Sequence, residues 1–323
     1  MKFIVTGGAG FIGHNVVRQL EEQGHECFIL DSVTDYGTMP KDELDYLYQQ
    51  RRSRMRAGVH HIDLCDRERV RNFFLTFGHG SAAVIHLASF PRQKVVNVNP
   101  VWGADVMSSA LVNLLELTKS MKIPRFVYIS SSMVYGDFKN DVTEDYNCQP
   151  QGQYGILKLA GEWLVKDYSR RGCFNHTIIR PSAVYGELDV EDRVISKFML
   201  AALRGSTLNV NGATETLDFT YVEDAAAGIV GATLSENTHN KTYNITKSHS
   251  WSLLDAANLA VSLAGSGNVD VRDKDADFPS RGALNIDAAR RDFEFDPKVD
   301  VEEGFRRYHK WFTESSYWQQ RLK

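Results

Sequence analysis

Two residues that could act together in proton transfer, Tyr154 and Lys158, stand four positions apart at the start of a predicted helix. Residues at this spacing share one face of a helix, one turn apart. A phenol is a poor base at its usual pKa of about 10, but a neighbouring ammonium group favours the phenolate and lowers that pKa. Tyr154 could then take the proton of an alcohol while a hydride leaves the same carbon. Ser131, at the end of the preceding predicted strand, could hold the alcohol oxygen. The spacing by itself is common on helix surfaces, so its meaning depends on the surrounding elements.

The N-terminal stretch predicts an element that would bring a hydride acceptor to this pair. An apolar strand over 3–5 runs into a glycine-rich turn and then into a helix over 15–23. In a dinucleotide site the first glycine allows the tight turn, the second lets a pyrophosphate approach, and the third lets the helix pack close to the strand. Gly7, Gly10 and Gly13 stand at these positions, and a helix N-terminus favours an anion. A turn with a purely structural role is the alternative.

Two acids extend this prediction. Asp31 ends the second apolar run, over 27–30, and lies about 20 residues past the glycines, where an acid can bond the adenosine ribose hydroxyls. A carboxylate at this position disfavours NADP, because the additional phosphate would meet a like charge. Asp63 lies at the end of the next predicted strand, over 59–64, and is a candidate for the adenine amino group. The predicted cofactor is therefore NAD.

Alternating strand and helix patterns predict the fold class. Further strands are expected over 82–88, 126–129 and 177–179, with helices over 67–77, 102–121 and 157–168. This order indicates an α/β fold, a Rossmann-like doubly wound parallel sheet. The less regular order after Arg180 indicates a smaller C-terminal substrate-binding lobe, with strands at 218–222 and 243–245. We expect an NAD-binding Rossmann domain over 1–179, rejoined at about 218–247, a substrate-binding lobe made mainly of 180–323, and a cleft between them.

The composition limits which kinds of binding partner are expected. The 323 residues carry a net charge of −4 and are 43% hydrophobic, which gives no reason to expect nucleic acid or an anionic membrane as partner. The four cysteines are scattered without metal-binding spacing, so no metal is expected and a reducing, cytoplasmic compartment is favoured. The first residues do not resemble a signal peptide, and no apolar run is long enough to span a bilayer.

Two other features have ordinary structural interpretations. His86 lies inside an apolar strand, where a histidine is more often a satisfied core residue than an acid or base. The polar insertion over 32–58 contains a basic run with arginines at 51, 52, 54 and 56, and a solvated helix face is favoured over a phosphate site. Because the insertion directly follows Asp31, we hypothesise that it covers the adenosine end of the cofactor.

Six motifs follow one another along the chain: TGGAGFIG at 6–13, HLA at 86–88, SSSMVYG at 130–136, YGILK at 154–158, RPSAVYG at 180–186 and DFTYVED at 218–224. In this order they resemble the landmarks of the extended short-chain dehydrogenase/reductases, within the NAD-dependent epimerase/dehydratase family that acts on nucleotide sugars. The resemblance spans most of the chain. It is closest in kind to UDP-glucose/UDP-galactose 4-epimerases.

The resemblance implies roles for individual residues. Ser131 would be the catalytic Ser/Thr and Tyr154 the base, while Lys158 would bind the nicotinamide ribose and tune the tyrosine. The cofactor site, including the residues already named, would comprise Gly7, Gly10, Phe11, Ile12, Gly13, Asp31, Asp63, Leu64, Leu87, Ala88, Ser89, Tyr154, Lys158 and Pro181. The substrate site would include Ser132, Met133, Val194, Asn209 and Arg281.

Several positions depart from the family pattern. Sugar 4,6-dehydratases of the family have an Asp-Glu pair after the catalytic Ser/Thr, where this chain has Ser132 and Met133. Neither side chain can transfer protons usefully, which argues against dehydration by that route. An arginine and an asparagine common in relatives are replaced by Leu217 and Ala183. Arg281 and Arg204 are candidate replacements for the missing diphosphate ligand.

The preferred interpretation is an NAD-dependent nucleotide-sugar epimerase, an isomerase that acts at C4 of a UDP-sugar through a transient 4-keto intermediate. A nucleotide-sugar 4-keto reductase, or another NAD(P)-dependent oxidoreductase of nucleotide sugars, is the alternative. A non-catalytic NAD-binding sensor is a third, against which the presence of Ser131, Tyr154 and Lys158 argues. The resemblance also implies a homodimer formed through the helices over 102–121 and 157–168.

Overall fold

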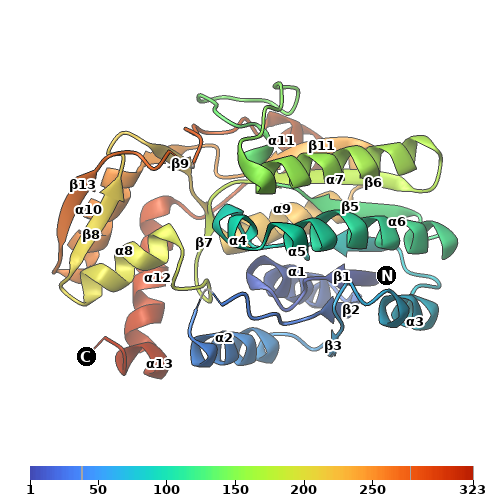
Figure 1. Ribbon diagram of the computed structural model, residues 1–323, viewed down its shortest axis with the longest axis horizontal. Helices are drawn as coiled ribbons and strands as arrows, with labels where there is room; N and C mark the ends of the chain where they lie inside the picture. The colour runs from blue at the N-terminus through green and yellow to red at the C-terminus, as the bar shows by residue number, and fades with distance from the viewer. Residues whose placement is uncertain (38, 277, 323) are drawn as a thin grey trace.

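A parallel β-sheet forms the centre of the protein. The computed structural model describes residues 1–37, 39–276 and 278–322, and within them the sheet has seven strands in the order β11-β6-β5-β4-β1-β2-β3 (Figure 1). These strands are β1 (Lys2–Thr6), β2 (Glu26–Asp31), β3 (Val59–His61), β4 (Ala83–His86), β5 (Arg125–Ile129), β6 (Asn175–Pro181) and β11 (Lys241–Ile245). Neighbouring strands are parallel throughout. The predicted doubly wound sheet is confirmed, and its strand order reverses between β1 and β4, where such sheets bind ligands.

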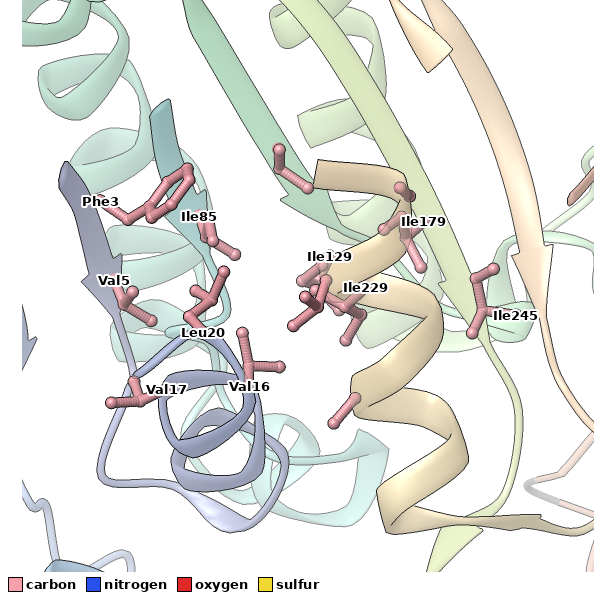
Figure 2. Packing of buried hydrophobic residues seen from close by; sticks show 14 of the residues in the cluster. Phe3, Val5, Val16, Val17, Leu20, Ile85, Ile129, Ile179, Ile229 and Ile245 are labelled. Carbon is pink, nitrogen blue, oxygen red and sulfur yellow. The ribbon is translucent and has the colours of Figure 1, made fainter. Parts of the chain in front are cut away.

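Helices cover both faces of this sheet. One face is covered by α3 (Arg67–Phe77), α6 (Ala110–Ser120) and α7 (Gly152–Arg170). The other is covered by α1 (Phe11–Glu22), α9 (Val222–Leu234) and α11 (Asp287–Phe293). Figure 2 shows the second core, where Val16 and Leu20 of α1 and Ile229 of α9 point toward the apolar side chains of the strands. Burial of these apolar faces is the main force that holds helices and sheet together.

A smaller lobe follows β6 and lies at the left of Figure 1. Its elements are α8 (Val194–Leu203), β8 (Thr207–Asn211), α10 (Leu253–Ala264), β13 (Asn268–Arg272), α12 (Val301–Glu314) and α13 (Ser316–Gln319). The parallel pair β8–β13 and these helices enclose a separate apolar core that includes Phe198, Phe305 and Trp318. The predicted C-terminal lobe is therefore present as a packed unit beside the sheet.

Shorter elements connect the two parts. They are α2 (Lys41–Ser53), α4 (Gln93–Val98), α5 (Pro100–Ala104), β7 (Val184–Tyr185), β9 (Thr216–Asp218), β10 (Thr220–Tyr221) and β12 (Ser250–Ser252). β7 pairs with β10, and β9 pairs with β12, outside the main sheet. No helix among the described residues is both long and apolar enough to cross a membrane.

Three predicted elements differ in detail. The helix expected over 102–121 is interrupted by a π-helical turn at Asp105–Ser109, which directs Val106 and Met107 toward Tyr154. The strand expected over 218–222 is divided, because its first part pairs with β12 as β9 and its second part pairs with β7 as β10. The buried Asp218 carboxylate, at the end of β9, accepts the backbone N–H of Leu284. β3 stops at His61, so Asp63 lies in the loop beyond this edge strand rather than within it.

Candidate active site

A cavity of about 920 Å³ opens at the carboxyl ends of the central strands, between the sheet and the C-terminal lobe. Residues that follow β1, β4 and β5 line it on the sheet side, and residues of α8, β8 and the segment around Arg281 line it on the lobe side. Every residue that the sequence analysis assigned to catalysis, cofactor or substrate lies on this lining. The fold thus brings together positions as far apart along the chain as Gly7 and Arg281, which are separated by 274 residues.

The glycine-rich turn after β1 has no room for side chains. Gly7 adopts a left-handed conformation with φ +72°, and a Cβ there would lie 2.6 Å from the backbone nitrogen of Ala88. A Cβ on Gly13 would lie 2.1 Å from the carbonyl oxygen of Gly7. No side chain caps the start of α1 at Gly10, so the first-turn N–H groups remain directed at the cavity. This geometry suits the pyrophosphate of a dinucleotide.

Asp31 lies at the end of β2, beside this turn. Its two carboxylate oxygens accept the backbone N–H groups of Ala9 at 2.9 Å and Val33 at 2.8 Å. Burial raises the pKa of Asp31, and these two hydrogen bonds oppose that rise. Each oxygen keeps a further lone pair for a ribose hydroxyl. The exposed Asp63 also borders the cavity, and its carboxylate accepts the N–H of Cys65 at 2.9 Å. The residues present therefore fit the adenosine and pyrophosphate portions of NAD.

The predicted reacting groups meet at the other end of the cavity. Because α7 begins at Gly152, Tyr154 lies in its first turn, and its ring packs against an apolar cluster that includes Phe90 and Val106. The Ser131 hydroxyl is near enough to the Tyr154 phenol to favour its ionised form, and both residues line the cavity. The Lys158 Nζ lies 5.9 Å from the Tyr154 ring centroid and donates a hydrogen bond to the Ile129 carbonyl at 2.8 Å.

The protein environment alone does not produce a phenolate. Burial raises the pKa of the Tyr154 phenol, and Arg193, the Ser131 hydroxyl and Arg281 oppose this rise. Burial also lowers the pKa of Lys158 to about 7, while the negative charge of Glu162 opposes that shift. Further positive charge near Tyr154 is needed to favour its ionised form.

The substrate side of the cavity contains hydroxyl and apolar groups next to Ser131 and arginines farther out. Ser132 donates a hydrogen bond to the hydroxyl of Ser182 at 3.1 Å, and both side chains are buried. Met133 is buried as well. Arg193 and Arg281 are cations that favour the ionised form of the Tyr154 phenol. No cluster of three or more metal-ligating side chains occurs in the described ranges.

The two arginines proposed as diphosphate ligands differ in their surroundings. In the described part of the chain, the buried Nε of Arg281 has no hydrogen-bond partner. The backbone carbonyl of Arg281 accepts a hydrogen bond from the Thr216 hydroxyl at 2.7 Å. Three residues further on, the Leu284 N–H donates to the Asp218 carboxylate at 3.0 Å. Arg204 instead donates to Glu191 and to the Arg321 carbonyl, each at 3.3 Å. Arg281 therefore has a buried donor left for a ligand, whereas Arg204 is already bonded within the protein.

The insertion over 32–58 borders the cavity and contacts the lobe. Tyr36, Met39 and Tyr48 line the cavity near Asp31. The prediction that the arginines of this insertion form a solvated face is wrong for Arg51. Its guanidinium is buried and donates two hydrogen bonds to the Leu188 carbonyl, at 3.2 and 2.6 Å. Long-range packing of α2 against the segment that follows β7 explains this burial.

His86 is a core residue, as expected. It is buried, its Nδ1 lies 2.7 Å from the Thr6 hydroxyl, and burial and the nearby Lys158 lower its pKa to about 3. Sequence reasoning did not identify Arg193 or Glu162. Glu162 follows Tyr154 and Lys158 at the same four-residue spacing, so the shared helix face was a signal that could have found it. Arg193 lies in a connecting segment without such a periodicity.

Fold and cavity together define a dinucleotide-binding α/β protein in which Ser131, Tyr154 and Lys158 line one cavity. Residues 3–246 match the NAD dependent epimerase/dehydratase family, and the chain belongs to this family. Bacillus subtilis YtcB, described as an uncharacterized UDP-glucose epimerase, is 27% identical, covering 94% of this chain and 95% of that protein. UDP-glucuronate 4-epimerase 2 of Arabidopsis thaliana is 28% identical, covering 96% and 75%. The crystal structure of the Bacillus cereus UDP-glucuronic acid 4-epimerase with UDP-glucuronic acid and NAD is also similar, with a TM-score of 0.87 and 25% identity over 96% of this chain and 98% of that one.

Proposed function

We propose that this protein is an NAD-dependent nucleotide-sugar epimerase that inverts C4 of a UDP-sugar. The observation that carries the proposal is the arrangement of Tyr154, Lys158 and Ser131 at one end of a cavity whose other end fits a dinucleotide. Relatives named as UDP-glucose or UDP-glucuronate epimerases support both the reaction and the substrate class. Residues 1–179, together with 218–247, would hold the cofactor, and most of 180–323 would hold the nucleotide sugar.

The proposed chemistry uses a proton transfer at the sugar C4 hydroxyl. NAD, held by the glycine turn, Asp31 and Lys158, would supply a hydride acceptor and a positively charged ring. Tyr154 removes the hydroxyl proton, and the Ser131 hydroxyl holds the same oxygen as it becomes a carbonyl. Lys158 stabilises the phenolate and orients the cofactor ribose. After the 4-keto sugar turns its other face, Tyr154 returns the proton, so the enzyme group is regenerated in each cycle.

The residues beside Ser131 favour epimerisation over dehydration. Loss of water from a keto sugar needs an acid and a base near C5 and C6. Ser132 and Met133 occupy the positions of the dehydratase acids, and neither is an acid. A 4-keto intermediate held in this cavity would therefore be reduced again rather than dehydrated.

The lobe would bind the nucleotide diphosphate. Arg281 would donate to the diphosphate through its guanidinium, since a phosphate accepts charge-assisted hydrogen bonds from arginine well. Val194 and Asn209, which line the lobe side of the cavity, would contact the nucleoside. The insertion around Tyr36 would cover the adenosine of NAD.

The direct test is incubation of the purified protein with UDP-glucose, UDP-galactose, UDP-glucuronate or UDP-N-acetylglucosamine, followed by proton NMR. Conversion of one of these to its C4 epimer without added reduced cofactor is expected. Substrate deuterated at C4 should keep its label, because the hydride returns to the carbon it left. Tyr154→Phe should abolish conversion while the protein still folds and binds NAD. Stoichiometric consumption of reduced cofactor would instead identify the reductase alternative, and full activity of Tyr154→Phe would refute the proposal.

We infer that two copies of the chain associate through α5, α6 and α7. Val101, Val112, Ile156 and Trp163 are large apolar side chains exposed on these helices, and Trp163 is 65% exposed. Exposed apolar side chains gathered on neighbouring helices are typical of interfaces. Light scattering should give a dimer for the wild type and a monomer for Trp163→Glu. A monomeric wild type would contradict the inference.

A further inference from the structure

A buried carboxylate lies directly behind the reacting residues, on the same face of α7. Glu162 stands one turn beyond Lys158 and two turns beyond Tyr154, and its side chain has no exposed surface. Helix α7 approaches β5 closely here, since a Cβ on Gly161 would lie 2.2 Å from the Tyr128 hydroxyl. This close approach lets Lys158 reach the Ile129 carbonyl and brings Glu162 to the carboxyl ends of β5 and β6.

The Glu162 carboxylate joins three elements that carry the site. Ser130, the residue before Ser131, donates its hydroxyl to Oε1 of Glu162 at 2.6 Å. Arg180, directly before Pro181 on β6, donates from Nε to Oε1 at 2.9 Å and from a terminal nitrogen to Oε2 at 2.7 Å. One side chain therefore ties α7, with Tyr154 and Lys158, to the strand that leads into Ser131. Bidentate pairing of this kind fixes geometry as well as charge.

The carboxylate of the buried Glu162–Arg180 pair also affects the pKa of Lys158. Glu162 favours the charged form of Lys158 and so opposes the lowering of its pKa by burial. The titratable groups around Lys158 are Tyr154 on α7, Tyr128 on β5, His86 on β4 and Glu162. Those around Glu162 are Arg180 and His176 on β6, Lys166 on α7, Tyr128 on β5 and Cys148 in the preceding loop. His86 and His176 are buried and their pKa values are lowered to about 3 and about 4, so neither imidazole adds a positive charge to this group at neutral pH.

We propose that Glu162 is a positioning residue that keeps Lys158 protonated and fixes Ser131 relative to Tyr154. This role rests on the proposed function, because it matters for catalysis only if those three residues carry the reaction. Without the carboxylate, a buried ammonium beside the phenol would lose its proton more readily. The phenolate would then lose the neighbouring cation that stabilises it.

The test uses lysine labelled with ¹³C at Cε, whose chemical shift follows the protonation of each lysine. The Lys158 signal is assigned by its loss in Lys158→Met. In Glu162→Gln, which preserves the shape of the side chain, the Lys158 titration midpoint should fall by about one pH unit. Tyr135→Phe is the matched control, because it removes the phenol hydroxyl that accepts from Arg180 in the same network but leaves the carboxylate in place. Its midpoint should equal that of the wild type.

Activity supplies the second readout. The kcat of Glu162→Gln should fall about tenfold at pH 8 and less at pH 6, with the KM for the nucleotide sugar unchanged, and Glu162→Asp should recover part of the loss. If Glu162→Gln does not fold, Glu162→Gln combined with Arg180→Met removes both buried charges, and the midpoint should still fall. An unchanged midpoint in the folded variant would overturn the proposal. A lowered midpoint in a protein whose wild type shows no epimerisation would refute the proposed function but leave the effect of Glu162 on Lys158 established.

Discussion

Replacing Arg281 by glutamine tests the proposed diphosphate site. The substitution removes the guanidinium but keeps a polar side chain of moderate length. Arg281 faces the cavity with a buried Nε that has no partner in the described chain, and burial lowers the pKa of its guanidinium to about 10. Burial of this cation therefore destabilises the folded protein, and a bound anion would offset that destabilisation.

The magnitude follows from the bonds that the guanidinium can make. A hydrogen bond to a charged group contributes about 1.5–3 kcal/mol, and about 1.4 kcal/mol corresponds to a tenfold change in affinity. UDP should therefore bind Arg281→Gln roughly 10- to 150-fold more weakly than the wild type. The free variant should be as stable as the wild type or more stable, because the substitution removes a buried cation whose Nε has no hydrogen-bond partner in the described chain.

Isothermal titration calorimetry with NAD present measures this change for UDP and, separately, for uridine. Uridine lacks the diphosphate, so its affinity should be the same for wild type and variant. Arg204→Gln is the matched control, since that guanidinium is already bonded to Glu191 and to the Arg321 carbonyl. Its affinity for UDP should change less than about threefold. Equal losses for UDP and uridine, or no loss for UDP, would refute the assignment of Arg281 to the diphosphate.

Three other predictions follow. Gly13→Ala should abolish NAD binding measured by fluorescence, because its Cβ would lie 2.1 Å from the Gly7 carbonyl oxygen; NAD affinity equal to wild type would contradict the fit. Lys158 has a folded-state pKa of about 7, below the unfolded value, so the unfolded chain binds more protons above pH 7 and this residue makes stability rise with pH. Between pH 7 and 9 the unfolding free energy of wild type should rise by about 2 kcal/mol relative to Lys158→Met in urea titrations, and parallel profiles would refute this. Arg125→Met should destabilise the protein by about 3 kcal/mol or more, because the buried guanidinium bonds the last carbonyls of α9, whereas the exposed Arg290→Met should change stability by less than about 0.5 kcal/mol.

Much of the fold could be predicted because its signals are local. Alternating buried strands and amphipathic helices predict a doubly wound parallel sheet, and the turn at Gly7 and Gly13 follows from backbone sterics that admit no side chain. Elements outside the sheet were predicted less well. The division of the 218–222 segment depends on its pairing with β12 and β7, which lie elsewhere in the chain, and no local pattern indicates it.

The residues of the candidate site likewise fall into those that local sequence patterns predict and those that only tertiary packing determines. By itself, the sequence determined the spacing of Tyr154 and Lys158 on one helix face, the glycine turn and the acid at Asp31, since each depends on residues close together in the chain. The tertiary structure alone decided that Arg51 is buried against Leu188 and that Arg193 and Arg281 face the Tyr154 phenol. It also decided that Glu162 pairs with Arg180 behind Lys158. Whether a charged side chain is solvated or buried depends on what packs over it, and those neighbours come from distant parts of the chain.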